Sequence, residues 1–288
     1  MSSLPIERRT LPTKEEFERE YLSTPGRPVI LTEAMTTWPA LDRWSFAFFA
    51  VRFGDRDVVA FDQLLAPKKA LRMKLRTFLQ YCEDPARLSR RLGDAGPLYV
   101  AFQPFACGSL LLGDFSWPAG IDNVYMSIGD EVYDWYLRTF GVLLIGPSGT
   151  ITPWHEDLFG THAWLGQIVG CKHFVFCAPD EAFTLGKQAA TAARRNADCI
   201  DRCAEDAPKY EGVVNPGEMI VFPKGWSHCV TALSPSISLS FNFVNSTNIL
   251  AHMLEIFRDL PAWAERLNSP ALRKALSITW SQKDLSFT

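Results

Sequence analysis

Residues 150–179, TITPWHEDLFGTHAWLGQIVGCKHFVFCAP, are the stretch around which we expect this chain to fold. Its runs of apolar and β-branched residues, separated by polar or glycine-containing turns, predict consecutive β-strands. At the end of the first run, His155 and Asp157 are two residues apart, so an extended backbone would direct both side chains to the same face. This stretch therefore predicts a β-sheet and half of a metal site.

The strand pattern continues on both sides of this stretch. It is preceded by FGVLLIG and followed by GEMIVFP, HCVTAL and SISLSFNFVN. Short strands with turn signals between them predict a barrel or a sandwich, and hence a mainly β fold. Residues 186–210 interrupt the pattern with a charged insertion, and loops of this kind often frame a substrate mouth.

Helices are predicted mainly outside the β region. In residues 1–96 we expect a helix over 14–22, capped by Thr13, and another over 75–81, alternating with strands at PVILT and DVVAFD. Residues 97–246 are the predicted β core, and residues 247–288 are predicted amphipathic helices broken at Pro261 and Pro270. Since no linker separates these regions, we expect one β-rich domain with helical additions at both ends.

The composition of the chain indicates its general class and excludes some kinds of partner. With 288 residues, 47% of them hydrophobic, the chain can bury a large core. A net charge of −3 gives no overall attraction to nucleic acid, and no run of apolar residues approaches membrane-spanning length. The first nine residues also lack the apolar segment of a secretory signal. We therefore expect a cytoplasmic protein that has neither a membrane nor a nucleic acid as its partner.

The cysteines fit the same compartment. There are seven, an odd and scattered set, so reduced thiols are the simplest interpretation. Cys199 and Cys203 are four residues apart and could share a metal ion, but no second pair with zinc-site spacing accompanies them.

A third metal ligand has to come from another part of the chain. A His-x-Asp pair alone is weak, because 5 histidines and 32 acidic residues produce about half such a match by chance. His228 strengthens it, since it stands at the start of a predicted strand, 71 residues beyond Asp157. Two histidines and one carboxylate on one face of a metal form the facial triad of non-haem Fe(II) oxygenases. We predict His155, Asp157 and His228 as metal ligands and catalytic residues.

Lys172 is a candidate for binding an anionic co-substrate. An iron oxygenase needs further electrons, and an oxidisable acid such as 2-oxoglutarate can supply them. In KHFVFCAP, Lys172 shares a strand face with Phe174 and Phe176, where a buried ammonium is costly unless an anion meets it. The alternative is a lysine at a strand end whose head reaches solvent.

The predicted strand SISLSFNFVN adds a second polar surface. Ser238, Ser240 and Asn242 alternate with large apolar residues, so one face is polar and the other apolar. If the polar face points into a barrel, the barrel holds a polar ligand. Alternatively the polar face is solvated, and periodicity does not separate the two.

Four segments together resemble the JmjC family of Fe(II)/2-oxoglutarate-dependent oxygenases, in particular its hydroxylase branch. They are RPVILTEAMTTWPALDRW (27–44), LLIGPSGTITPWHED (143–157), GQIVGCKHFVFCAPDEAF (166–183) and NPGEMIVFPKGWSHCVTAL (215–233). The segment DLFGTHAWLGQIVGCK is similar to that of the JmjC lysyl hydroxylase. The LYVAFQ and TPWHED segments also resemble the asparaginyl hydroxylase that inhibits hypoxia-inducible factor.

This resemblance implies a double-stranded β-helix of the cupin or jelly-roll type, with iron on the three predicted ligands. It also implies that Lys172 and Thr152 bind the distal carboxylate of 2-oxoglutarate, with Tyr99 as a third donor and with Ser240 and Asn242 beside the co-substrate. Strict alternation would point Thr152 away from His155, so its role requires a bulge at Pro153. Leu165 departs from the family pattern, because the lysyl hydroxylase has asparagine there.

The implied reaction is hydroxylation of a C–H bond with O2, giving succinate and CO2. The expected substrate is a protein side chain, a peptide or a small metabolite. The same chemistry would serve an N-methyl-lysine demethylase or an RNA base hydroxylase, and a non-catalytic cupin-like binding protein is the alternative from another class. The apolar faces of the C-terminal helices suggest a homodimer. We also considered Tyr125, Phe159, Trp164 and Trp226 as pocket walls, with plain core packing as the simpler role.

Overall fold

A computed structural model describes residues 3–62, 70–88, 97–102, 109–179 and 209–266, with side chains described to residue 258 in the last range. Most of the predicted 186–210 insertion, the Cys199 and Cys203 pair, and Pro270 lie outside the described residues.

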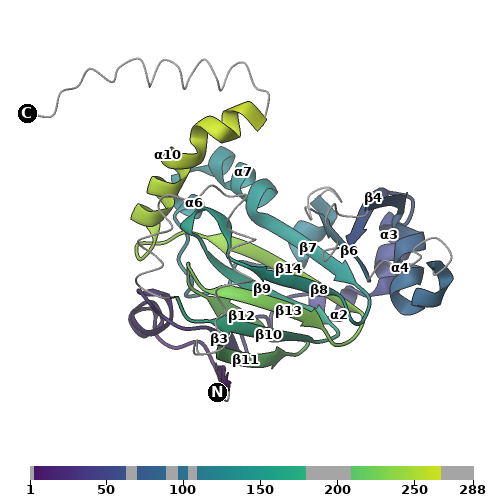
Figure 1. The fold of residues 1–288 in the computed structure, drawn as a ribbon, viewed down its shortest axis with the longest axis horizontal. Coiled ribbons are helices and arrows are strands. Elements are labelled where there is room, and N and C mark those ends of the chain that lie inside the picture. Colours follow the sequence, from purple (N-terminus) through teal and green to yellow (C-terminus); the bar gives the residue numbers. More distant parts are fainter. Residues whose placement is uncertain (1–2, 63–69, 89–96, 103–108, 180–208, 267–288) are drawn as a thin grey trace, which may run out of the picture.

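The core consists of two mixed β-sheets that face each other (Figure 1). The larger contains β7 (Gly141–Gly146), β9 (His162–Val169), β12 (Met219–Phe222) and β14 (Ser236–Phe243). The smaller contains β8 (Ile151–His155), β10 (Lys172–Cys177), β11 (Lys209–Val214) and β13 (Ser227–Ala232). Phe174 and Phe176 of the smaller sheet share a buried cluster with Leu165 and Phe222 of the larger. The predicted cupin-type class, mainly β with helical additions, is confirmed.

The N-terminal region shares the larger sheet. β2 (Glu7–Arg9) and β3 (Val29–Leu31) extend one edge, and β6 (Leu98–Phe102), β4 (Asp57–Asp62) and β5 (Ala70–Lys74) extend the other, while β1 (Leu4–Pro5) pairs with β11. The helices here are α1 (Lys14–Phe17), a π-helical turn η1 (Glu18–Leu22), α2 (Ala40–Arg43), α3 (Phe46–Phe53), α4 (Leu75–Glu83) and a 3-10 turn η2 (Pro85–Leu88). As predicted, the Thr13 hydroxyl accepts the N–H of Glu16, at 3.3 Å. Strand β5 was not predicted.

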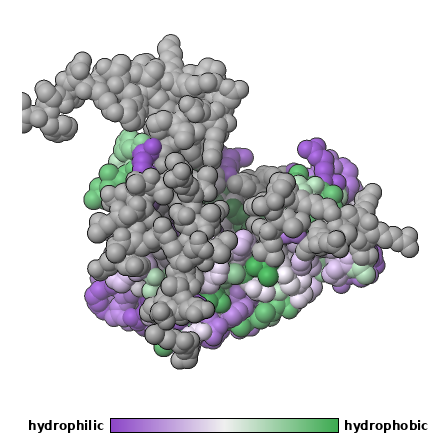
Figure 2. Space-filling model, viewed as in Figure 1, coloured by the Kyte–Doolittle hydropathy of each residue, from purple (hydrophilic) through white to green (hydrophobic). Residues whose placement is uncertain are grey.

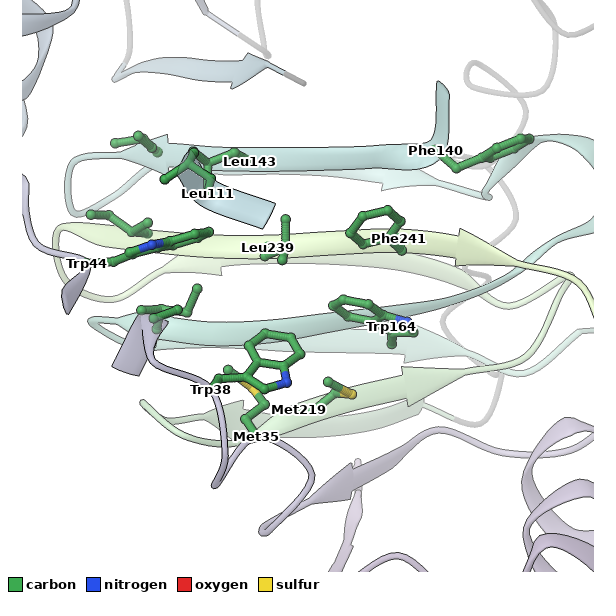
Figure 3. Close-up of a cluster of buried hydrophobic side chains, with 14 of the residues drawn as sticks. Met35, Trp38, Trp44, Leu111, Phe140, Leu143, Trp164, Met219, Leu239 and Phe241 are labelled. Carbon is green, nitrogen blue, oxygen red and sulfur yellow. The ribbon is translucent and has the colours of Figure 1, made fainter. Parts of the chain in front are cut away.

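A second apolar core lies on the outer face of the larger sheet (Figure 3). Trp164 and Phe241 project from β9 and β14, and Trp38 packs edge-on against Trp164 with ring centroids 5.7 Å apart. The turn η4 (Ser109–Asp114) and the helices α6 (Tyr125–Ile128) and α7 (Asp130–Phe140) contribute further residues. Because these helical additions cover the outer face, the polar residues that alternate with these side chains on β14 face the interior between the sheets.

The C-terminal helix α10 (Ile249–Arg266) contacts α6 where His252 meets the Tyr125 hydroxyl (Figure 1). It continues through Pro261, so the predicted break there is wrong. Proline at this position lacks the N–H that would donate to the carbonyl of Phe257, so the helix continues with one hydrogen bond fewer. No helix in the described ranges is long and apolar enough to span a membrane.

Asp114 offers a test of how the helical additions are attached. Its carboxylate is fully buried and accepts hydrogen bonds from the Arg43 guanidinium at 2.5 Å and the Trp44 indole at 2.8 Å. We expect Asp114→Ala to lower the free energy of unfolding by about 1–3 kcal/mol, because the buried indole N–H loses its acceptor. As a control, Asp122→Ala removes an exposed ion pair with Lys14 and should cost at most about 1 kcal/mol. Equal effects in urea titrations would contradict this role of Asp114.

Candidate functional site

The three predicted metal ligands converge at the adjoining ends of β8 and β13. His155 lies directly opposite His228 in the strand pairing, and their ring centroids are 4.1 Å apart. The Asp157 carboxylate is 3.9 Å from His155 Nε2. One ligand atom from each residue can be chosen so that all three lie within 4.8 Å of one another. This spacing suits three ligands around one ion.

Hydrogen bonds to the backbone orient both imidazoles. His155 Nδ1 is 2.8 Å from the carbonyl oxygen of Pro153, and His228 Nδ1 is 3.2 Å from that of Trp226. A carbonyl only accepts, so each Nδ1 must carry the proton and each Nε2 keeps its lone pair. Metal-binding histidines are commonly fixed in this way.

Electrostatics also fit a cation at this point. Burial raises the pKa of Asp157, while His155 and a hydrogen bond from Asn242 act in the opposite direction. Burial lowers the pKa of His228 well below its ordinary value, so the ring is neutral. A divalent cation would stabilise the buried carboxylate and accept both lone pairs. The donor set therefore fits Fe(II) and related first-row divalent metals.

A cluster of one buried lysine and two hydroxyl groups lies in the same cavity. Only 2% of Lys172 is exposed, and its Nζ is 3.3 Å from the Tyr99 hydroxyl, which also hydrogen-bonds Thr152. No ion pair links Lys172 to a carboxylate in the described part of the chain. Burial alone lowers the pKa of Lys172 to about 7. Burial raises the pKa of Tyr99, so both groups are held toward their neutral forms. An anion would relieve this cost, so the cluster is suited to a carboxylate.

A register shift brings Thr152 into this cluster. In the β8–β13 pairing, Thr152 is opposite Val230 and His155 is opposite His228, so three residue steps on β8 match two on β13. The extra residue is the bulge that the role of Thr152 required. It lets Thr152 and His155 line the same cavity despite their odd spacing.

All eight predicted site residues line one cavity of about 220 Å³. Ser240 and Asn242 are among them, so the polar face of β14 points inward, as one of the two alternatives predicted. Ser240 donates to the carbonyl of Trp164 at 2.9 Å, whereas Asn242 donates to Thr161 Oγ1 at 2.9 Å and also bonds Asp157. Their contact with a co-substrate stays a prediction.

The other residues that line the cavity are apolar. They comprise Ala101, Val142, Leu144, Leu165, Phe174, Phe222 and Val230. None of the four aromatic residues considered as walls lines this cavity. Trp164 and Phe159 belong to the outer core, Trp226 to the inner core, and Tyr125 packs beside His252. Core packing, the simpler role, is what the structure shows for them.

The sequence matches the model of a known protein family. A model described as a cupin-like domain matches residues 14–249. The chain belongs to the cupin-like domain family. Several relatives carry the names of JmjC proteins, and one of them is named a 2-oxoglutarate and iron-dependent oxygenase.

Three relatives show the range of names within this cupin-like group. The chain is 25% identical over 260 residues to the lysine-specific demethylase JMJ21 of Arabidopsis thaliana, covering 84% of this chain and 26% of the relative. It is 26% identical over 258 residues to the 2-oxoglutarate and iron-dependent oxygenase JMJD4 of Mus musculus, covering 81% and 59%. It is 25% identical over 253 residues to the bifunctional arginine demethylase and lysyl-hydroxylase psr-1 of Caenorhabditis elegans, covering 82% and 60%. The chain thus spans about a quarter to three fifths of their lengths.

Sequence reasoning missed several residues that hold this cupin-like site in place. Ser227 donates to the Glu156 carboxylate at 3.0 Å, which links the neighbours of two ligands across β8 and β13. His162 accepts the N–H of Lys224 at 3.1 Å and donates to Thr247 at 2.8 Å. Burial lowers the pKa of His162 to about 3, so it is a neutral structural histidine. These contacts link residues distant in the sequence, and no local pattern signals them.

The pKa of Lys172 predicts a pH dependence for 2-oxoglutarate binding. Without a bound ligand, Lys172 has a pKa of about 7. A bound carboxylate would raise this pKa, so Lys172 takes up a proton when 2-oxoglutarate binds above pH 7. With Mn(II) replacing Fe(II) in the absence of O2, the affinity should fall about tenfold per unit as pH rises above 7. Lys172→Met should bind 2-oxoglutarate more weakly and lose this slope. An unchanged slope in the variant would show that another group causes it.

Proposed function

We propose that this chain is an Fe(II)- and 2-oxoglutarate-dependent dioxygenase that hydroxylates a C–H bond of a protein side chain, a peptide or a small metabolite. The observation that carries the proposal is the shared cavity, which contains the His155, Asp157 and His228 triad together with Lys172, a buried cation that has no carboxylate partner in the described chain. A protein that only binds a metal would not need a buried, unpaired lysine in the same cavity.

The strand register fits a co-substrate of limited length. His228 pairs with Phe176 on β10, and Lys172 is four residues before Phe176 on that strand. Four residues of a β-strand span about 13 Å, and the long lysine side chain and the imidazole both occupy part of this space. A short dicarboxylic acid can therefore meet the metal at one end and the Lys172, Tyr99 and Thr152 cluster at the other.

In the proposed mechanism, His155, Asp157 and His228 would hold the iron through one face. When bound, the iron would couple O2 activation and oxidative decarboxylation of 2-oxoglutarate to hydroxylation of the substrate. Lys172, Tyr99 and Thr152 would bind the distal carboxylate and fix its orientation. The apolar walls would exclude bulk water from the reacting groups.

Turnover tests the proposed reaction. Wild-type protein with Fe(II), 2-oxoglutarate, O2 and candidate substrates should form succinate, and His155→Ala and Asp157→Ala should reduce this rate at least about a thousandfold, because each removes an iron ligand. His173→Asn is a matched control, because His173 lies outside the cavity and bonds Glu211 at 3.1 Å. If the ligand variants turn over like wild type, the triad assignment is wrong.

Demethylation is a second candidate reaction, because relatives are named as lysine-specific and arginine-specific demethylases. Hydroxylation of an N-methyl group gives an unstable product that releases formaldehyde. Peptides with and without N-methyl-lysine or N-methyl-arginine separate the two reactions. Formaldehyde from methylated peptides would favour demethylation, and a stable gain of one oxygen atom would favour hydroxylation.

We also propose that α10 mediates a homodimer. Leu250, Met253, Leu254 and Phe257 form a stripe at helical spacing that is 46–71% exposed, and Figure 2 shows hydrophobic residues on this part of the surface. His252 of α10, together with Asn248 just before the helix, binds the turn after Asp157. A helix with apolar residues on its outer face needs a partner, and a second α10 presents a matching stripe.

Light scattering tests this assembly. Wild type should have the mass of a dimer, and Leu254→Glu combined with Phe257→Glu should have that of a monomer, because two charges would enter the apolar contact. A wild-type monomer, or a dimer that persists in the variant, would rule out this interface.

A further inference from the structure

The turn that follows Asp157 has a conformation that its own sequence disfavours. The 3-10 turn η5 (Leu158–Gly160) places Phe159 at φ 63° and ψ 23°. Among the described residues, Phe159 is the only non-glycine residue with positive φ. For a bulky residue this left-handed backbone is strained and persists only when its surroundings impose it.

The surroundings that impose this conformation come from the start of α10. His252 Nδ1 lies 2.7 Å from the carbonyl oxygen of Phe159, and Asn248 Nδ2 donates to that of Gly160 at 2.9 Å. Since the Phe159 carbonyl only accepts, His252 Nδ1 carries the proton. His252 Nε2 therefore accepts the Tyr125 hydroxyl at 2.5 Å, which fixes this tautomer.

Close packing adds to these bonds. A Cβ on Gly160 would lie 3.2 Å from the carbonyl carbon of Ala251, so the backbone of α10 rests directly on the turn. Among the described elements, η5 is the one that α10 contacts most extensively. The residues at the start of α10 therefore bind the carbonyls of both Phe159 and Gly160.

We propose that α10 positions the metal ligand Asp157, with His252 and Asn248 as positioning residues and Tyr125 fixing the His252 ring. Asp157 is separated from Phe159 by one residue, so relaxation of Phe159 to an ordinary conformation would redirect the chain that carries the carboxylate. The proposal rests on the proposed function, because it assumes that Asp157 binds a metal. It predicts that a side chain on a helix outside the β core controls metal affinity.

Metal titration tests this inference without turnover. Co(II) would replace Fe(II), with affinity and the visible spectrum of bound Co(II) as readouts. His252→Leu should weaken the affinity about tenfold and shift the spectrum toward that of Asp157→Ala. His252→Asn keeps a donor near the position of Nδ1 and should bind like wild type. Tyr125→Phe removes one hydroxyl and should weaken the affinity less than His252→Leu does.

The controls separate this effect from general destabilisation. His173→Leu removes a half-buried histidine on β10, which bonds Glu211 and not the turn, and should leave affinity and spectrum unchanged. If His252→Leu does not fold, Tyr125→Phe and Asn248→Ala carry the test. Wild-type affinity and spectrum in these variants would overturn the positioning role alone. Failure of wild type itself to bind Co(II) would instead overturn the proposed function, and this inference with it.

Discussion

The pairing of β8 with β13 is the constraint on which the rest of this site depends. It sets His155 opposite His228, and its extra residue in β8 turns Thr152 toward the same cavity. A shift of one residue would direct one histidine away from the metal position, because side chains alternate across a strand. The hydrogen bond from Ser227 to Glu156 holds the same two strand ends together, next to the ligands.

Segments from both ends of the chain support the two halves of the metal site. On one side, the Trp226 indole donates to the carbonyl of Pro25 at 2.9 Å, and the carbonyl of Trp226 accepts His228 Nδ1. On the other side, α10 holds the turn after Asp157. The N-terminal segment and the C-terminal helix therefore form part of the support of a site whose ligands all come from the β core.

Local periodicity predicted much of the fold and of the site. The alternation in β10 and β14 correctly grouped Lys172 with Phe174, and Ser240 with Asn242, because side-chain direction along a strand is a local property. Alternation did not show which face of β14 was interior, since that depends on the helices that cover Phe241 on its other face. The bulge at Pro153 was predicted because the spacing of Thr152 and His155 conflicts with the role of Thr152 that the family resemblance implies. The hold of His252 on Phe159, 93 residues away in sequence, left no local signal.

The central claim is that one cavity binds both a metal and 2-oxoglutarate. The most direct measurement is anaerobic absorption spectroscopy of wild-type protein titrated with Fe(II) and 2-oxoglutarate, separately and together. The account predicts a visible band that appears only when both are present, because the co-substrate would bind the metal while Lys172 holds its far carboxylate. Retention of neither metal nor 2-oxoglutarate, with no band, would contradict it and would favour a cupin-like binding protein without catalysis.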